Sequence, residues 1–113
     1  SDLEISEARK EELVAVYRQT VLVAVLEASD ALAARKVADS RAALLETAAD
    51  EARNAYKLAR QRYDSGSIDF QTMLDTQRAQ LNAEDSTTQA RLEQIQASIA
   101  LIVALGGGWQ ETP

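Results

Sequence analysis

Residues 3–63 contain neither proline nor glycine, and this uninterrupted stretch is the feature that most restricts how the chain can fold. Proline and glycine are the residues that most disfavour a helix interior. A helix over the whole stretch would be a rod of about 90 Å, at roughly 1.5 Å per residue. Ordinary helices have about 11–12 residues, so a compact domain of 113 residues has no room for this one. The sequence therefore predicts an elongated, all-α protein.

A stripe of mostly small residues follows the predicted first helix in steps of four and three. Its members are Tyr17, Val21, Ala24, Ala28, Ala31, Arg35, Ala38, Ala42, Leu45, Ala49, Ala52, Tyr56, Ala59 and Tyr63. Arg35 is the only charged member. A 3.5-residue repeat of this length predicts a left-handed coiled coil with a partner helix. Because alanine dominates the stripe, we expect the two helices to approach closely.

A second stripe lies beside the first and carries Leu44, Ala48, Ala55 and Leu58. Leu22, Val25 and Leu32 lie on a similar flank nearer the N-terminus. A helix with two neighbouring apolar stripes can contact one helix on each side, as in a helical barrel. An ordinary bundle helix with a wide apolar stripe is the alternative that the pattern leaves open.

The helix signal breaks once, at about residues 65–69. Gly66 can adopt the left-handed backbone conformation that ends many helices, and Asp69 is a good N-cap for a second helix. Basic residues that favour a helix C-terminus precede the break, namely Arg53, Lys57, Arg60 and Arg62. The sequence thus predicts one domain, a long antiparallel helical hairpin over residues 1–113. Its parts are a helix at about 3–64, a turn at about 65–69, a helix at about 70–105 and a Gly-Gly-Gly-Trp tail.

The predicted second helix carries larger apolar residues at heptad-compatible spacing, with polar residues between them. The apolar members are Leu74, Leu81, Leu92, Ile95, Ile99 and Ile102, and the polar members are Arg78, Asp85 and Thr88. Another flank of this helix carries small residues, namely Ala79, Ala83, Ser86, Ala90, Ala97 and Ala100. This helix would be about 54 Å long. It can therefore cover only part of the first helix. Residues 3 to about 30 should keep an apolar face without a partner in this chain.

Composition excludes several classes of function. The chain has no cysteine and no histidine, so thiolate catalysis, disulfides, the usual zinc sites and the commonest general base are absent. A net charge of −6 argues against nucleic-acid binding. No apolar run reaches the roughly 20 residues that span a bilayer. Asp69 and Asp75 fall on an exposed turn without a pocket, so we expect no catalytic, cofactor or metal site and no enzyme.

Three stretches of the chain together resemble a known family. They are Arg62-Tyr63-x-x-Gly66 with Leu74-Asp75-x-Gln77-Arg78, then Tyr17 to Leu22 with Glu27-x-x-Asp30-Ala31-Leu32, and finally Ala104-Leu105-Gly106-Gly107-Gly108-Trp109. In this order and spacing they resemble the C-terminal portion of an outer membrane factor. These are the TolC-like exit ducts of Gram-negative efflux and secretion systems, and the likeness is to the OprM-like branch that serves RND-type pumps.

The resemblance implies a fold and a set of partners. Family members are trimers with a β-barrel in the outer membrane and an α-helical barrel in the periplasm. The chain would be a fragment of that periplasmic barrel, namely a descending helix, a periplasmic turn and an ascending helix, without the β-strands, the first repeat and the lipid-anchored N-terminus. The start at Ser1-Asp2 without methionine agrees with an excised or processed chain. The implied partners are a periplasmic adaptor (membrane fusion protein) hairpin and, indirectly, the inner-membrane RND transporter.

The resemblance also implies two sets of site residues around the turn. Tyr63, Gly66 and Leu74 match the family's tip pattern, and Asp75 and Arg78 match positions that constrict the closed entrance. The adaptor-docking set is Arg62, Tyr63, Gly66, Ser67, Ile68, Phe70 and Leu74, and the entrance set is Gln71, Asp75 and Arg78. Gln71 falls where relatives often have leucine, so a hydrophobic constriction ring is not implied here.

The residues of the turn support a docking role independently of the resemblance. Tyr63, Ile68 and Phe70 place apolar groups at an end of the hairpin where a simple connector would be polar. Two other interpretations remain open at this stage. The chain could be the hairpin of a periplasmic adaptor, or a structural coiled coil or helical bundle without a channel role.

Overall fold

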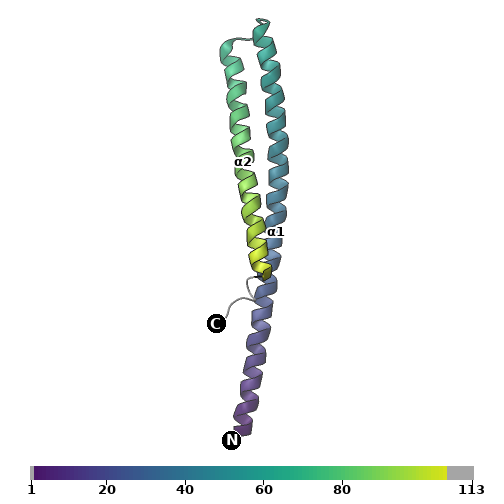
Figure 1. Ribbon diagram of the computed structural model, residues 1–113, viewed down its shortest axis with the longest axis vertical. Helices are drawn as coiled ribbons and strands as arrows, with labels where there is room; N and C mark the ends of the chain where they lie inside the picture. The colour runs from purple at the N-terminus through teal and green to yellow at the C-terminus, as the bar shows by residue number, and fades with distance from the viewer. Residues whose placement is uncertain (1, 107–113) are drawn as a thin grey trace.

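The computed structural model describes residues 2–106, which form two helices. Helix α1 spans Asp2–Asp64 and helix α2 spans Phe70–Gly106. The helices run antiparallel as a hairpin that measures 96 × 22 × 16 Å (Figure 1). The described residues contain no strand, and the predicted all-α hairpin is confirmed. The predicted Gly-Gly-Gly-Trp tail lies beyond Gly106, outside the described residues apart from its first glycine.

Helix α1 packs on α2 through the small-residue stripe predicted from the sequence. Its four buried residues, Ala38, Ala42, Ala49 and Ala59, are all members of that stripe. The half-buried residues Ala28, Ala31, Leu45, Ala52 and Tyr56 belong to it as well. Arg35 and Tyr63 remain exposed at their stripe positions. The 3.5-residue pattern thus correctly identified the face that α1 presents to α2.

Helix α2 turns toward α1 a face that is small and polar in its middle and has one large apolar residue near each end. Its buried residues are Met73, Thr87, Ala90 and Leu101. The larger apolar residues predicted to share a heptad pattern lie elsewhere, and we call five of them the outer stripe. These are Leu81, Leu92, Ile95, Ile99 and Ile102, which are between 54% and 69% exposed. The apolar residues of α2 therefore mostly face away from the hairpin's own seam.

The second stripe of α1 also faces outward. Leu44 is 73% exposed and Leu58 is 48% exposed. Each helix thus contacts the other helix through one face and leaves a further apolar face uncovered within the described chain. An isolated amphipathic hairpin would place its large apolar residues between its helices, so this arrangement is the reverse of the usual one.

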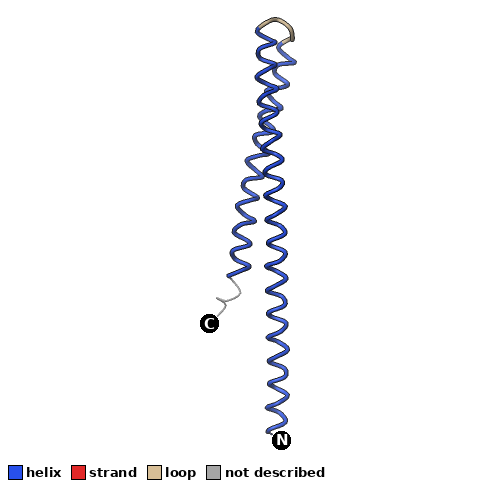
Figure 2. Tube along the Cα trace, turned by 90° about the vertical axis from the view of Figure 1, so that its right-hand side faces the viewer, coloured by secondary structure: helices blue, strands red, loops and turns tan. Residues whose placement is uncertain are grey.

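The N-terminal part of α1 projects beyond the end of α2. Every residue from 2 to 27 is exposed, and Ala28 is the first half-buried position (Figures 1 and 2). This overhang includes several large apolar residues, among them Leu3, Leu13, Tyr17, Leu22 and Leu26. The predicted partnerless face at residues 3 to about 30 is therefore present. Neither described helix has a segment long and apolar enough to cross a membrane.

Candidate functional site: the hairpin tip

The end of α1 is closed by a Schellman motif, in which backbone amides beyond the helix bond to its last carbonyls. The Ser67 amide donates to the Arg62 carbonyl at 2.8 Å, and the Gly66 amide donates to the Tyr63 carbonyl at 2.9 Å. Gly66 has φ +81°, which side-chain-bearing L residues rarely adopt. The Ser65 hydroxyl adds a bond to the same Arg62 carbonyl at 2.9 Å. These bonds give the tip a defined backbone shape.

The start of α2 is capped by Asp69, as the sequence predicts. The Thr72 amide donates to Oδ1 of Asp69 at 2.8 Å, and the Met73 amide donates to the Asp69 carbonyl at 3.2 Å. Hydrogen bonding from Thr72 lowers the pKa of the Asp69 carboxyl below its ordinary value. A carboxylate in this position also suits the positive end of the helix dipole.

An aromatic pair joins the two helices at the tip. The ring centroids of Tyr63 and Phe70 lie 5.9 Å apart at an interplanar angle of 64°, an edge-to-face arrangement. Tyr63 is 39% exposed and Phe70 is 55% exposed, so much of the pair's surface faces solvent. Ile68 and Leu74 are half-buried beside it. Of the apolar residues in the predicted docking set, Phe70 is thus the most accessible.

The three predicted entrance residues lie on one exposed side of the first turns of α2. Gln71, Asp75 and Arg78 follow one another at steps of four and three, which places them along one face. The Gln71 side-chain amide donates to Oδ1 of Asp75 at 3.1 Å. Arg78 is exposed one turn further along the same face. The structure brings most of the docking set to the tip, whereas Leu74 lies within the first turns of α2 at the level of the entrance set.

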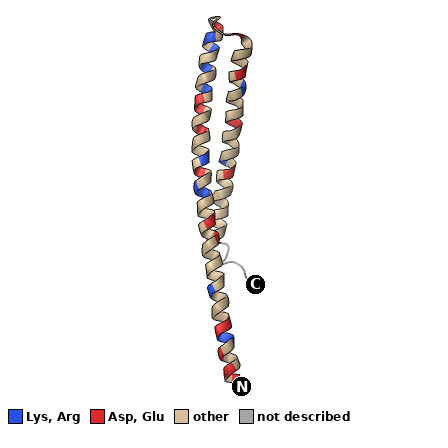
Figure 3. Cartoon of the chain, turned by 180° about the vertical axis from the view of Figure 1, so that it is seen from behind, with Lys and Arg blue, Asp and Glu red and all other residues tan. Residues whose placement is uncertain are grey.

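Charge is distributed unevenly near the tip. The last turns of α1 carry Arg53, Lys57, Arg60 and Arg62, and Figure 3 shows this basic stretch next to the turn. Arg53 is bound by Asp50 and by Glu84 of α2. The hydrogen bond to Glu84 and then that to Asp50 raise the pKa of Arg53 above its ordinary value. The tip region therefore combines basic residues in the last turns of α1 with an aromatic pair at the end of the hairpin.

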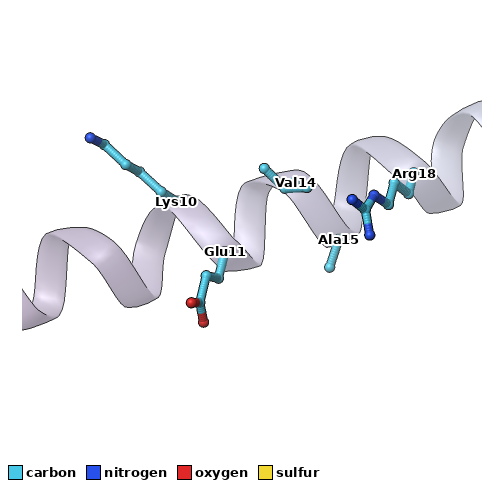
Figure 4. A pocket seen from close by; sticks show the side chains of 5 residues that line it. All are labelled: Lys10, Glu11, Val14, Ala15 and Arg18. Atoms are coloured by element: carbon cyan, nitrogen blue, oxygen red, sulfur yellow. The ribbon is translucent and has the colours of Figure 1, made fainter.

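Two shallow surface depressions of the described residues both lie on α1, away from the tip. A shallow, open surface on the overhang is lined by Lys10, Glu11, Val14, Ala15 and Arg18. Figure 4 shows that all five side chains come from the single helix α1. No group of three acidic residues in residues 2–106 is placed to hold a metal ion.

Sequence reasoning did not identify two features of this region. One is Ser65, whose hydroxyl also lies 3.1 Å from the hydroxyl of Ser67, and the Ser-Gly-Ser triplet was the available signal. The other is the row of polar residues on the inner face of α2. Their seven-residue spacing, at Gln80, Thr87 and Gln94, is visible in the sequence but stands out less than the leucines and isoleucines beside it.

Comparison with known proteins identifies the chain's relatives. The family described as "Outer membrane efflux protein" matches residues 1–107. The chain belongs to this family. Family membership favours the channel interpretation over the adaptor hairpin and the unrelated coiled coil, and the family consists of efflux channels rather than enzymes. The efflux-family assignment thus confirms the resemblance drawn from the three stretches of sequence.

Three curated relatives of the chain come from Pseudomonas. The chain is 39% identical over 107 residues to the pyoverdine export outer membrane protein OpmQ of Pseudomonas putida, covering 95% of this chain. It is 37% identical over 115 residues to the outer membrane protein OprJ of Pseudomonas aeruginosa, covering 98%. It is 33% identical over 109 residues to the toluene efflux pump outer membrane protein TtgI of Pseudomonas putida, covering 96%. The chain spans 23% of the length of each relative. No solved structure matches the chain.

Proposed function

We propose that this hairpin forms part of the wall and the periplasmic entrance of a trimeric efflux duct in the outer membrane of a Gram-negative bacterium. In this proposal its tip docks on the hairpin of a periplasmic adaptor within a tripartite RND-type pump. The observation that carries the proposal is the outward position of the apolar residues in a member of the outer membrane efflux protein family. A helix in a closed wall needs a neighbouring helix on each side. Each helix here has one face that contacts the other helix and a second, apolar face that is uncovered.

The wall role follows from the two kinds of face. The inner seam holds α1 to α2 through alanines, and Leu44 and Leu58 of α1 face the other way. The outer stripe of α2 is longer still and faces away from α1. Exposed apolar faces of this extent usually mark contact with another protein surface. Neighbouring helices of a barrel wall would cover both faces.

The docking role is supported by the build of the tip. Phe70 and Tyr63 place an exposed aromatic surface at the end of a long rod, where it is the first part to meet a partner. The Schellman motif at Gly66 and the cap at Asp69 fix the backbone beneath this surface. A preorganised surface loses less conformational entropy on binding. The tip is therefore suited to an end-on contact with an adaptor hairpin.

The entrance role rests on Asp75 and Arg78. In a trimer, copies of this face of α2 around a threefold axis would bring acidic side chains toward one another. Repulsion between them is relieved where Arg78 of a neighbouring protomer supplies the opposite charge. Exposed pairs of this kind contribute only about 0–1 kcal/mol each. The closed entrance would then be marginally stable, and adaptor docking could shift it toward the open state.

Sedimentation equilibrium of the chain with a cognate adaptor hairpin tests the docking proposal. We expect a mixed species with the unaltered chain and loss of that species with Phe70→Ser. The matched control is Leu3→Ser, which removes an even more exposed apolar residue (73% against 55% for Phe70) from the far end of α1. Mixed species that persist with Phe70→Ser, or that are lost equally with Leu3→Ser, would refute docking through the tip.

Single-channel conductance tests the entrance proposal in the full-length efflux protein. Asp75→Ala removes the proposed constricting carboxylate and should raise the conductance of the closed channel. Asp85→Ala, a change of the same kind further from the tip along α2, should have a smaller effect. Unchanged conductance with Asp75→Ala would argue against this entrance.

A further inference from the structure

Helix α2 has two faces that could pack on α1, and it uses the less apolar one. The outer stripe carries leucine and isoleucine along most of the helix. The face in contact with α1 buries the large apolar residues Met73 and Leu101 near its two ends, but between them it carries glutamine, threonine and alanine. Burial of apolar surface is the main force that brings helices together. On apolar content alone, α2 would turn its outer stripe toward α1. Another interaction must therefore select the face that is used.

A row of polar residues follows the face of α2 that packs on α1 and the exposed rim beside it, and we call it the polar ladder. It consists of Gln80, Glu84, Thr87, Arg91 and Gln94, in steps of four and three. Four of the five contact α1 directly. Glu84 accepts a hydrogen bond from Nε of Arg53 at 2.9 Å. Arg91 forms an ion pair with Glu46 at 3.2 Å. The side-chain amide of Gln94 donates to Asp39 at 2.7 Å. Gln80 supports the ladder from within α2 by donating to Glu84 at 3.1 Å.

Thr87 is the buried centre of the ladder. Its side chain is only 5% exposed, and its hydroxyl lies 3.0 Å from the Leu45 carbonyl of α1 and 3.0 Å from the Ala83 carbonyl of α2. A side chain can reach a backbone carbonyl of the opposite helix only where the helices approach closely. Ala49 and Ala90, which are almost fully buried, allow this approach. Bulkier residues of the outer stripe would hold the helices apart and forfeit these contacts.

The geometry points to a selective role for these contacts. We propose that the polar ladder determines which face of α2 turns toward α1, and so keeps the outer stripe available to a helix from outside the hairpin. Polar residues within a coiled-coil seam are known to specify the arrangement of helices at some expense of stability. Here the alternative being excluded is the same helix turned about its own axis. The rotation of α2 concerns the hairpin alone, whereas the availability of the outer stripe to an outside helix rests on the proposed wall function.

The rotation of α2 can be measured with single cysteines, because the chain has none of its own. Ala90→Cys places a thiol in the seam, where the residue is 1% exposed, and Ile95→Cys places one on the outer stripe, where it is 58% exposed. In the otherwise unaltered chain, maleimide should modify the thiol at position 95 much faster than the thiol at position 90. Glu46→Arg with Thr87→Val sets two arginines face to face and removes the buried hydroxyl. We expect this double change to reduce the ratio of the two rates about tenfold, as the loss of one hydrogen bond and one ion pair implies.

Two further variants complete the experiment. Arg91→Glu added to Glu46→Arg/Thr87→Val restores an ion pair of opposite polarity and should recover part of the protection at position 90. Thr88→Val removes a hydroxyl from the exposed side of α2 and should leave both rates unchanged. If position 90 stays protected in Glu46→Arg/Thr87→Val, the buried hydroxyl and the Arg91–Glu46 pair do not select the face, and the proposal is wrong. Loss of helical circular dichroism in that variant would also overturn it, because the ladder would then stabilise the hairpin rather than choose its face.

Discussion

Gly66→Ala tests whether the shape of the tip depends on a left-handed backbone. A Cβ built on Gly66 meets nothing within 4 Å, so a steric clash contributes nothing to the effect. The backbone contribution remains, because φ is +81° and an L residue in this region costs about 1–2 kcal/mol. Alanine also reduces the conformational entropy of the unfolded chain, and this offsets roughly 0.4–1 kcal/mol of the backbone cost. We expect a net destabilisation of about 1 kcal/mol.

Gly106→Ala is the matched control for this prediction. Gly106 also has open space around its Cβ position, but its φ lies outside the left-handed region. The entropy effect should therefore act alone and stabilise the chain slightly. Urea unfolding followed by helical circular dichroism, repeated at several protein concentrations, measures both variants. The difference between them isolates the left-handed strain at about 1–2 kcal/mol. Equal unfolding midpoints for the two variants would refute the reasoning.

Two further predictions concern the cap and the seam. Hydrogen bonds lower the pKa of Asp69 in the folded chain, so its stabilising effect should be complete above the unfolded pKa and disappear as pH falls through the folded pKa. Asp69→Asn keeps a capping side chain that does not titrate, so its urea midpoint should not show this loss of stability in acid. A parallel decline of the urea midpoint in both chains would contradict the assignment of the loss to Asp69. Ala49→Leu overpacks a fully buried seam position and should destabilise the hairpin by about 1–3 kcal/mol in the same assay. Leu44→Ala, on the exposed second stripe, should change the stability of the isolated hairpin little, and a similar loss in both variants would mean that the seam is misassigned.

The sequence was sufficient to predict the hairpin and the face of α1 that forms its seam. The unbroken stretch from 3 to 63 without glycine or proline leaves few alternatives to one long helix, and a 3.5-residue repeat of alanines marks one face unambiguously. The turn could be predicted equally well, since Gly66 adopts the left-handed backbone conformation that ends α1 and Asp69 caps the start of α2. These features depend on interactions close in sequence, which a pattern records directly.

The face of α2 that meets α1 could not be read from its pattern. The helix carries a leucine and isoleucine row and a small, polar row, and hydrophobicity favours the first. The choice depends on cross-helix contacts such as Thr87 with the Leu45 carbonyl, which link residues 42 positions apart. The roles of the tip residues could not be read from the sequence pattern either. Their placement at the end of the rod was predictable, but their contribution to docking depends on a partner and stays a prediction.

Photo-crosslinking from the tip in the assembled pump tests the central claim most directly. A photo-reactive phenylalanine analogue replaces Phe70 in the full-length efflux protein, and a second version carries it at Ser40, an exposed position midway along α1. If the hairpin docks through its tip, irradiation of cells should join the adaptor to the Phe70 version and not to the Ser40 version. An adaptor adduct from Ser40 alone, or none from Phe70 in cells whose pump is active, would contradict the account.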